Sequence, residues 1–205
     1  MIKLITSILI IITIIVGIII MLGRNKEQEK RLLDLYNELN TSQTYLFTME
    51  ENKENKTIMA KKDDKTIIDD YSENSHTTTI VKDNNTYLVL HDREEYYVYE
   101  QNNVEQAILT DGLQEITAKE FLTGTEKIKG KKYSYEEYQG STMFMKAGSL
   151  DINEEEIKTR FYFDENNNLV YIRTIKGVNQ ELLKITIQKE VDDSIFVIPS
   201  TYAEN

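Results

Sequence analysis

The sequence predicts a mainly β fold with helices, of the α+β class. We expect a curled antiparallel half-barrel sheet with an N-terminal helix and one short internal helix, preceded by one transmembrane helix. Short runs rich in threonine, isoleucine, valine and tyrosine alternate with clusters of aspartate, asparagine, lysine and glycine. These turn clusters are too brief for the crossovers that parallel strands need, so the strands are predicted to be antiparallel. Beyond the first 23 residues, two segments have apolar side chains at helical spacing.

The chain begins with an uncharged stretch from Leu4 to Leu22. As a helix that rises about 1.5 Å per residue, this stretch roughly matches a hydrocarbon core of about 30 Å. The alternative is a cleaved signal peptide, whose apolar region is shorter and ends at a small-residue cleavage site. Residues 21–25 provide no such site. We therefore predict a transmembrane signal-anchor helix over residues 1–23 and one folded domain over 24–205.

The folded domain is predicted to open with an amphipathic helix over residues 24–41. Leucines and Tyr36 recur there every three or four residues, without Gly or Pro. Alternation at Tyr45, Phe47 and Met49 then predicts a strand. The clusters Asp63-Asp64 and Asp83 to Asn85 are typical of hairpin turns. Further strands are predicted near 56–62, 65–71, 75–82, 86–91 and 94–100.

A short helix is predicted over residues 110–124, because Leu113, Ile116 and Phe121 have nearly helical spacing and Gly124 follows. Strands are then predicted over 126–138, about 141–147, 157–164, 169–176 and 181–190. A twisted sheet of about ten strands tends to curl or split, and two helices are too few to cover both of its faces. We therefore expect a half-barrel with the helices over its concave side. A closed barrel and a two-sheet sandwich are the alternatives.

Charge and composition exclude several classes of function. With 35 acidic against 24 basic residues, the net charge is −11. Such a chain repels a phosphate backbone, so nucleic acid is not expected as a partner. The sequence contains no cysteine, which excludes disulfides, thiolate metal sites and a cysteine nucleophile.

The residues that carry chemistry in other proteins show no catalytic or metal-binding pattern here. His76 and His91 have no second ligand at metal spacing and are interpreted as solvent-facing strand residues. Residues 164–168, DENNN, resemble the start of a calcium loop, but Leu169 and Ile175 replace the glycine and glutamate that such a loop requires. Doublets such as Asp69-Asp70 point to opposite faces of a strand. We predict no catalytic residue, no metal site, no cofactor and no enzymatic activity.

The alternating apolar residues define one candidate binding surface. If the inward face of the half-barrel is only partly filled by helix and loop, it forms a lipid-sized apolar cleft; if it is filled, the same residues are ordinary core. The candidate ligand-binding residues are Phe47, Met49, Leu88, Leu90, Phe161, Phe163, Ile185 and Ile187.

The order of these segments resembles the LolA-like lipoprotein-carrier superfamily. An N-terminal helix with LLDLYNELNTSQTYLFTM precedes the meander, and the hairpin RFYFDENNNLVYIRTI precedes a last strand and the clause VDDSIFVIPSTY. In the clause, Asp193, Phe196, Pro199 and Tyr202 match the family's closing pattern. Pro199 cannot donate to a strand ladder, so it is predicted at or beyond a sheet edge, with Phe196 and Ile198 tucked under the sheet.

The resemblance implies binding without catalysis. We expect a non-enzymatic envelope protein that binds a lipid acyl chain or a lipidated ligand, such as a lipoprotein, in an apolar hollow. The alternative is a protein-interaction, sensor or accessory module of the same fold, with a filled hollow and an envelope protein as partner. The working arginine of the carriers has no counterpart in the early strands. The basic residues flanking the anchor lean towards a cytoplasmic domain, whereas the resemblance implies an extracytoplasmic domain on a single-pass protein of the bacterial cell membrane.

Overall fold

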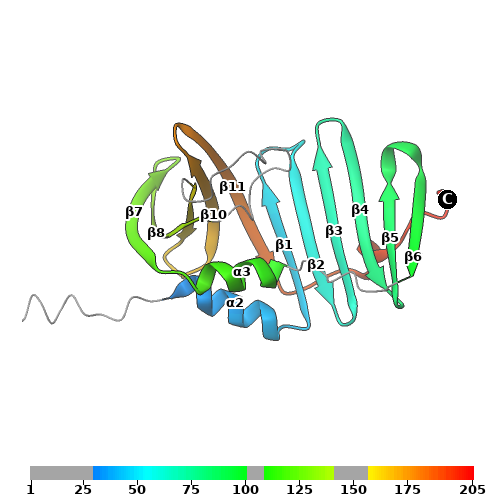
Figure 1. Cartoon of the computed structure of the whole chain (residues 1–205), viewed down its shortest axis with the longest axis horizontal. Coiled ribbons are helices and arrows are strands. Elements are labelled where there is room, and N and C mark those ends of the chain that lie inside the picture. Colours follow the sequence, from blue (N-terminus) through cyan, green and yellow to red (C-terminus); the bar gives the residue numbers. More distant parts are fainter. Residues whose placement is uncertain (1–29, 101–108, 141–156) are drawn as a thin grey trace, which may run out of the picture. The chain divides into compact units, whose positions relative to one another are not determined.

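The computed structural model describes residues 30–100, 109–140 and 157–205 (Figure 1). The chain divides into two units, Met1–Arg31 and Leu32–Asn205. The fold described below is that of the second unit.

The described residues form one sheet of twelve strands, two α-helices and two 3₁₀-helices. The helices are α2 (Arg31–Thr41), α3 (Leu109–Thr117), η1 (His91–Arg93) and η3 (Asp193–Phe196). The first six strands are β1 (Thr44–Glu50), β2 (Lys56–Lys62), β3 (Lys65–Ser72), β4 (Ser75–Lys82), β5 (Asn85–Leu90) and β6 (Glu95–Glu100). The others are β7 (Phe121–Ile128), β8 (Lys131–Gln139), β9 (Ile157–Phe163), β10 (Leu169–Lys176), β11 (Asn179–Gln188) and β12 (Ala203–Glu204).

The strand order is β12-β6-β5-β4-β3-β2-β1-β11-β10-β9-β8-β7. The sheet therefore consists of two meanders, β1 to β6 and β7 to β11, which join where β1 pairs with β11. The pairs are antiparallel, except that the two-residue β12 runs parallel to β6. The sheet is open, with β12 and β7 at its two edges.

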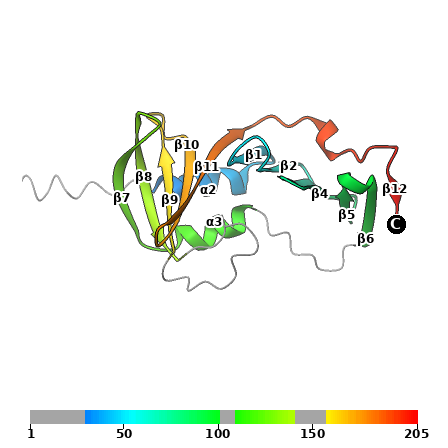
Figure 2. The same ribbon diagram turned by 90° about the horizontal axis from the view of Figure 1, so that it is seen from above.

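Two hydrophobic cores lie on opposite faces of this sheet. Figure 2 shows α2 and α3 on one side of the sheet and the C-terminal segment on the other. We call the face covered by α2 and α3 the helix face, and the face covered by the C-terminal segment Val191–Tyr202 the tail face. On the helix face, Phe47 of β1 packs with Phe161 of β9 beneath both helices. On the tail face, Ile67 of β3 and Val89 of β5 pack with Phe196 of the C-terminal segment.

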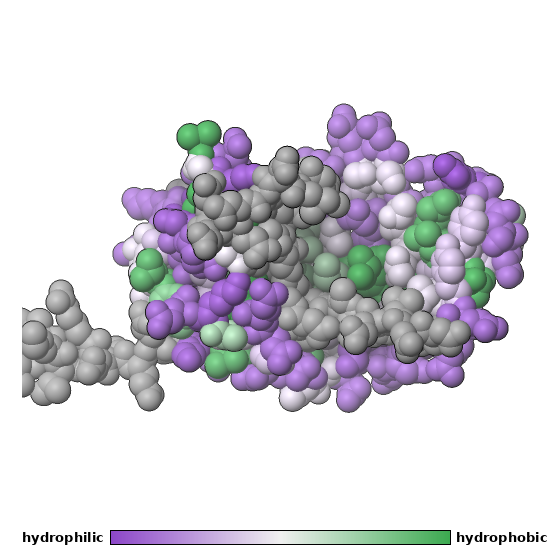
Figure 3. Space-filling view, viewed as in Figure 1, coloured by the Kyte–Doolittle hydropathy of each residue, from purple (hydrophilic) through white to green (hydrophobic). Residues whose placement is uncertain are grey.

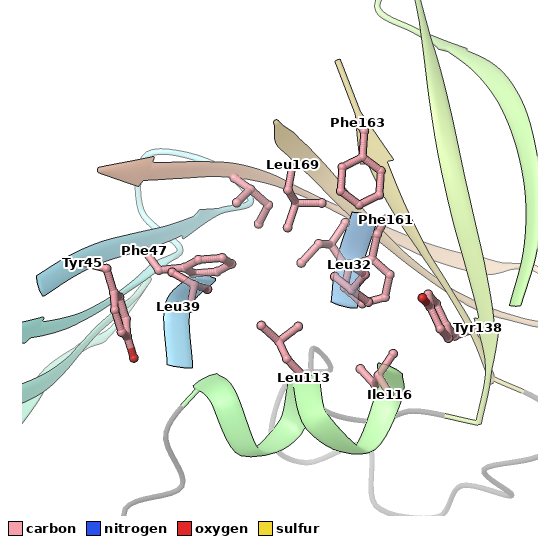
Figure 4. Packing of buried hydrophobic residues seen from close by; sticks show 12 residues of the cluster. Leu32, Leu39, Tyr45, Phe47, Leu113, Ile116, Tyr138, Phe161, Phe163 and Leu169 are labelled. Atoms are coloured by element: carbon pink, nitrogen blue, oxygen red, sulfur yellow. The ribbon is translucent and has the colours of Figure 1, made fainter. Parts of the chain in front are cut away.

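The core on the helix face joins residues from both meanders. Figure 4 shows Leu113 and Ile116 of α3 pointing toward Leu32 of α2 and Phe161 of β9. Leu113 and Ile116 are each 1% exposed. Their spacing of three residues puts them on one stripe of α3, which explains why so short a helix is held against the sheet.

The core on the tail face depends on the C-terminal segment. Phe196, within η3, is buried against Ala60, Ile67 and Ile80, and Ile198 packs beside it. The predicted position of Phe196 and Ile198 under the sheet is thus confirmed. Asp192 caps η3 by accepting a hydrogen bond from the backbone N–H of Ser194 over 2.8 Å.

The predicted fold class is wrong in its central feature. In place of a half-barrel of about ten strands, the described chain has one open sheet of twelve strands and two short helices. A half-barrel has one apolar concave side, whereas here the buried side changes from the helix face to the tail face along the sheet. The C-terminal segment, from which only Phe196 and Ile198 are predicted to lie under the sheet, covers a core of its own.

The predicted single-pass membrane protein is also corrected. None of the helices in the described ranges is long and apolar enough to cross a bilayer. The expected signal-anchor over residues 1–23 lies outside the described residues. The structure therefore does not support the predicted membrane anchor or the predicted location in a cell membrane with an extracytoplasmic domain.

Local differences have local reasons. The predicted helix over 110–124 ends at Thr117, and Phe121 to Gly124 belong to β7. The single strand predicted over 126–138 is a hairpin that turns at Lys129 and Gly130, which both have positive φ (49° and 84°). The turns predicted at Asp63 and Asp83 are confirmed, also with positive φ. The predicted strand at 141–147 lies outside the described residues, as do residues 24–29 of the first predicted helix.

Candidate functional site

The eight predicted binding residues share the helix face of the sheet. The strand registers place them there, for example through the pairs Phe47↔Ile187 and Met49↔Ile185. Six belong to the core beneath α2 and α3 or pack against it: Phe47, Met49, Phe161, Phe163, Ile185 and Ile187. Leu88 and Leu90 lie on the same face of β5, outside that core and half-buried. Ligand binding by these eight residues stays a prediction.

An apolar row crosses the helix face from the core toward β6. Residues paired in register across neighbouring strands are Met59, Ile68, Thr79, Leu88 and Tyr97. Met59 packs against the core under the helices, whereas Ile68 is 38% exposed. Figure 3 shows apolar side chains at the surface over β3 to β5. We call these five residues the apolar row.

A pocket of about 220 Å³ lies on the opposite, tail face, between β3 to β5 and the C-terminal segment. Its apolar wall includes Ile67, Ile80 and Val89 of the sheet, together with Ile195 and Val197 to Pro199 of the segment. Its polar wall is a compact group formed by Asp69, Tyr71, His76, Thr78 and His91.

The polar group is joined by short hydrogen bonds. Oδ1 of Asp69 accepts from the hydroxyl of Thr78 over 2.5 Å and lies 2.8 Å from Nε2 of His76. The Thr78 hydroxyl also lies 2.7 Å from Nε2 of His91. Because that hydroxyl donates its one proton to Asp69, it accepts from Nε2–H of His91. Nδ1 of His91, 3.1 Å from the hydroxyl of Tyr202, is then free to accept.

Three rings form a stack beside this group. The His76 ring lies between those of Tyr71, at 4.0 Å, and His91, at 3.7 Å. Burial, and secondly the neighbouring His76, lower the pKa of His91 below its ordinary value. Burial, helped by the hydrogen bond to Asp69, raises the pKa of Tyr71 to about 12. Both side chains are therefore neutral at pH 7.

Antiparallel register brings these residues together. Asp69 pairs with Thr78, and Tyr71 with His76, across the β3–β4 hairpin. His91 begins η1, directly after β5, and Asp92 anchors that end by accepting from the backbone N–H of His76 over 3.2 Å. The opposed sides of Asp69 and Asp70 are confirmed, because Asp70 accepts from Thr57 on the other face.

The sequence-based interpretation missed this group. His76 and His91, predicted to face the solvent, are both half-buried and stacked on each other. The usable signal was the register of the correctly predicted β3–β4 hairpin. Its turn at Glu73 and Asn74 sets Asp69 level with Thr78, so that Asp69 and His76 fall on one face.

A second polar group lies on the tail face of β7 to β10. The carboxylate of Glu126 accepts from Arg160 over 3.0 Å, from the hydroxyl of Tyr162 over 2.7 Å and from Arg173. Arg160 also donates to Glu137 over 2.6 Å. These charges satisfy one another, so we interpret this group as structural.

Comparison with known proteins identifies no family. No family model and no curated protein matches the chain. Among solved structures, the crystal structure of an uncharacterized conserved protein from Thermus thermophilus is similar, with 8% identity and a TM-score of 0.48. The match covers 87% of this chain and 100% of that chain.

Proposed function

We propose that the protein is a non-enzymatic binding protein that holds an acyl chain, free or attached to a lipidated ligand, along the apolar row. The observation that carries this proposal is the continuity of the row. It begins at Met59, against the core beneath the helices, and reaches Leu88 and Tyr97 where the sheet is only half-buried. The resemblance to LolA-like carriers supports the same class of ligand.

The dimensions and chemistry of the row suit an extended hydrocarbon chain. From Met59 to Tyr97 the row spans four strand spacings, about 19 Å in all. Four of its five residues are apolar or aromatic, and the fifth, Thr79, presents a methyl group beside its hydroxyl. Covering such a surface with an apolar ligand removes it from water, at about 25 cal/mol per Å². Ile68 is 38% exposed, so an apolar ligand that covers it removes a large apolar side chain from water.

The experiment is titration of the full chain with a fluorescent fatty acid. Ile68→Glu places a carboxylate in the row and is expected to abolish the fluorescence change. Leu122→Glu is the matched control, because Leu122 is 67% exposed on strand β7, away from the row, and this change should leave binding intact. Thermal melts of both variants establish that they are folded. Equal binding by Ile68→Glu and the wild type would contradict the proposal.

A second candidate is a protein-interaction, sensor or accessory module with a filled hollow. It is favoured by one observation: six of the eight predicted binding residues are packed in or against the core under α2 and α3. This candidate expects no fatty-acid binding by the wild type. The same titration therefore separates the two candidates.

A further inference from the structure

We propose that Asp69, His76 and His91 bind one divalent transition-metal ion of the zinc type. This inference is independent of the proposed acyl ligand, because these residues lie on the tail face and the apolar row lies on the helix face.

Asp69, His76 and His91 supply the kinds of donor atom that zinc binds. One ligand atom from each of the three residues, two imidazole nitrogens and a carboxylate oxygen, lies within 4.8 Å of the others. Zinc is bound by histidine nitrogen and carboxylate oxygen at about 2.0–2.2 Å, so three donors this close can converge on one ion. Two histidines and one carboxylate leave a fourth position open to water or a small anion.

Neighbouring hydrogen bonds hold the two histidines in place. A histidine that binds a metal through one nitrogen usually has the other held by a hydrogen bond. The hydroxyl of Tyr202 lies 3.1 Å from Nδ1 of His91, which leaves Nε2 directed toward Thr78, the residue that bonds Asp69. Asp92 fixes the backbone of His76. The side chains of Asp69 and His76 are 16% and 27% exposed, so the site is shielded and still open to the pocket.

Binding changes a defined set of contacts. The hydroxyl of Thr78 now bridges Asp69 and His91, and the ion takes over that bridging role. The two imidazole planes, which are within 6° of parallel, must tilt for both Nε2 lone pairs to point at one ion. His91 then carries its proton on Nδ1 and donates it to Tyr202. The site thereby ties β3, β4, η1 and the C-terminal segment to one another.

The test is calorimetric titration of Zn²⁺ into the untagged, chelator-treated full chain. One ion per chain is expected, with a raised melting temperature. Asp69→Asn and His91→Gln should abolish this binding. Asp70→Asn is the matched control, because Asp70 is the neighbouring carboxylate on the other face. Tyr202→Phe should weaken binding by about 10–100-fold, as loss of an outer hydrogen bond typically does.

NMR of the wild type tests the same site without variants, whose loss of binding could come from misfolding. The chain contains two histidines, so imidazole NMR signals report this site alone. Addition of Zn²⁺ is expected to shift both sets of signals together at one equivalent. The proposal is overturned if Zn²⁺ leaves the two imidazoles unchanged, or if Asp69→Asn and Asp70→Asn bind Zn²⁺ equally well.

Discussion

Glu136 of β8 accepts a hydrogen bond from the backbone N–H of Leu32, in the first turn of α2, over a distance of 3.2 Å. Both residues are fully buried, and 104 positions separate them in the sequence. The first N–H groups of a helix have no partner within the helix and favour a negative charge. The carboxylate of Glu136 also accepts from the hydroxyl of Tyr138 over 3.0 Å. Glu136, in the second meander, thus provides a hydrogen-bond acceptor for the N-terminus of α2, the helix that precedes the first meander.

Glu136→Ala is expected to lower the free energy of unfolding by about 1–3 kcal/mol, because it leaves buried donors without their acceptor. Urea unfolding followed by circular dichroism measures the change. Glu165→Ala, in the exposed turn before β10, is the control and should stay within about 0.5 kcal/mol of the wild type. Equal stability of the two variants would mean that Glu136 does not hold α2.

Phe196→Ala tests whether the C-terminal segment forms a true core. Phe196 is 2% exposed, and removing such a ring typically costs about 3–5 kcal/mol. Val197→Ala alters the next residue, which is 64% exposed, and should change stability by less than about 0.5 kcal/mol. Chemical denaturation of both variants gives the comparison. If Phe196→Ala lowered the free energy of unfolding as little as Val197→Ala, the tail-face core would not contribute to folding.

The Glu126 network predicts a pH dependence of stability. Burial acts to raise the pKa of Glu126, but the hydrogen bonds from Tyr162 and Arg173 and the charges of Arg173 and Arg160 outweigh it and lower the pKa below its ordinary value. A carboxyl whose pKa is lowered by folding stabilises the protein above its unfolded pKa, and this contribution is lost as the pH falls through the folded value.

The measurement is the free energy of unfolding of the wild type and of Glu126→Gln between pH 7 and pH 3. The difference between the two proteins should be constant above about pH 5.5 and should shrink as the pH falls through the ordinary glutamate value, since unfolded wild-type Glu126 then binds a proton that the folded protein, with its lowered pKa, does not yet bind. Other carboxyls titrate in both proteins and cancel in the difference. A difference that grows on acidification has the wrong sign for this network.

Gly124 is covered by an aromatic ring. A Cβ at this position would clash with Cζ of Tyr135, whose ring in turn stacks on the guanidinium of Arg160 at 4.7 Å. Gly124→Ala is therefore expected to displace the ring and to cost about 1–3 kcal/mol. In the background of Tyr135→Ala the same change should cost much less, which a double-mutant cycle of unfolding free energies measures. Additive costs would exclude the ring as the cause.

Most strands of this fold can be predicted from the sequence, because alternating apolar residues and turns such as Asp83-Asn84 are local signals. The β7–β8 hairpin was missed because its turn uses Lys129, a residue that rarely adopts positive φ. The change of the buried side from the helix face to the tail face could not be predicted from the residues of β5 alone. Tyr87 and Val89 on one face and Leu88 and Leu90 on the other are all large apolar or aromatic side chains, and the position of Phe196 decides that Val89 is the one fully buried.

For the candidate sites, too, the sequence predicts what depends on neighbouring residues and does not predict contacts between distant segments. That the eight predicted residues lie on one face follows from the period of two along each strand, and the registers agree with it. Which of them are covered depends on where α2 and α3 pack, and no short-range pattern contains that information. The contact between His76 and His91 depends on three strands in register and on η1, so no short-range pattern around either histidine predicts it.

The pairing of β1 with β11 has a consequence for biosynthesis. The first strand to leave the ribosome finds one of its two neighbours only after residues 179–188 have been translated. Until then the nascent meander from β1 to β6 presents the unpaired edge of β1 to the other proteins around it. We expect this edge to be the principal target of chaperones and of intermolecular strand pairing during synthesis, and a ribosome stalled before residue 179 to expose it longest.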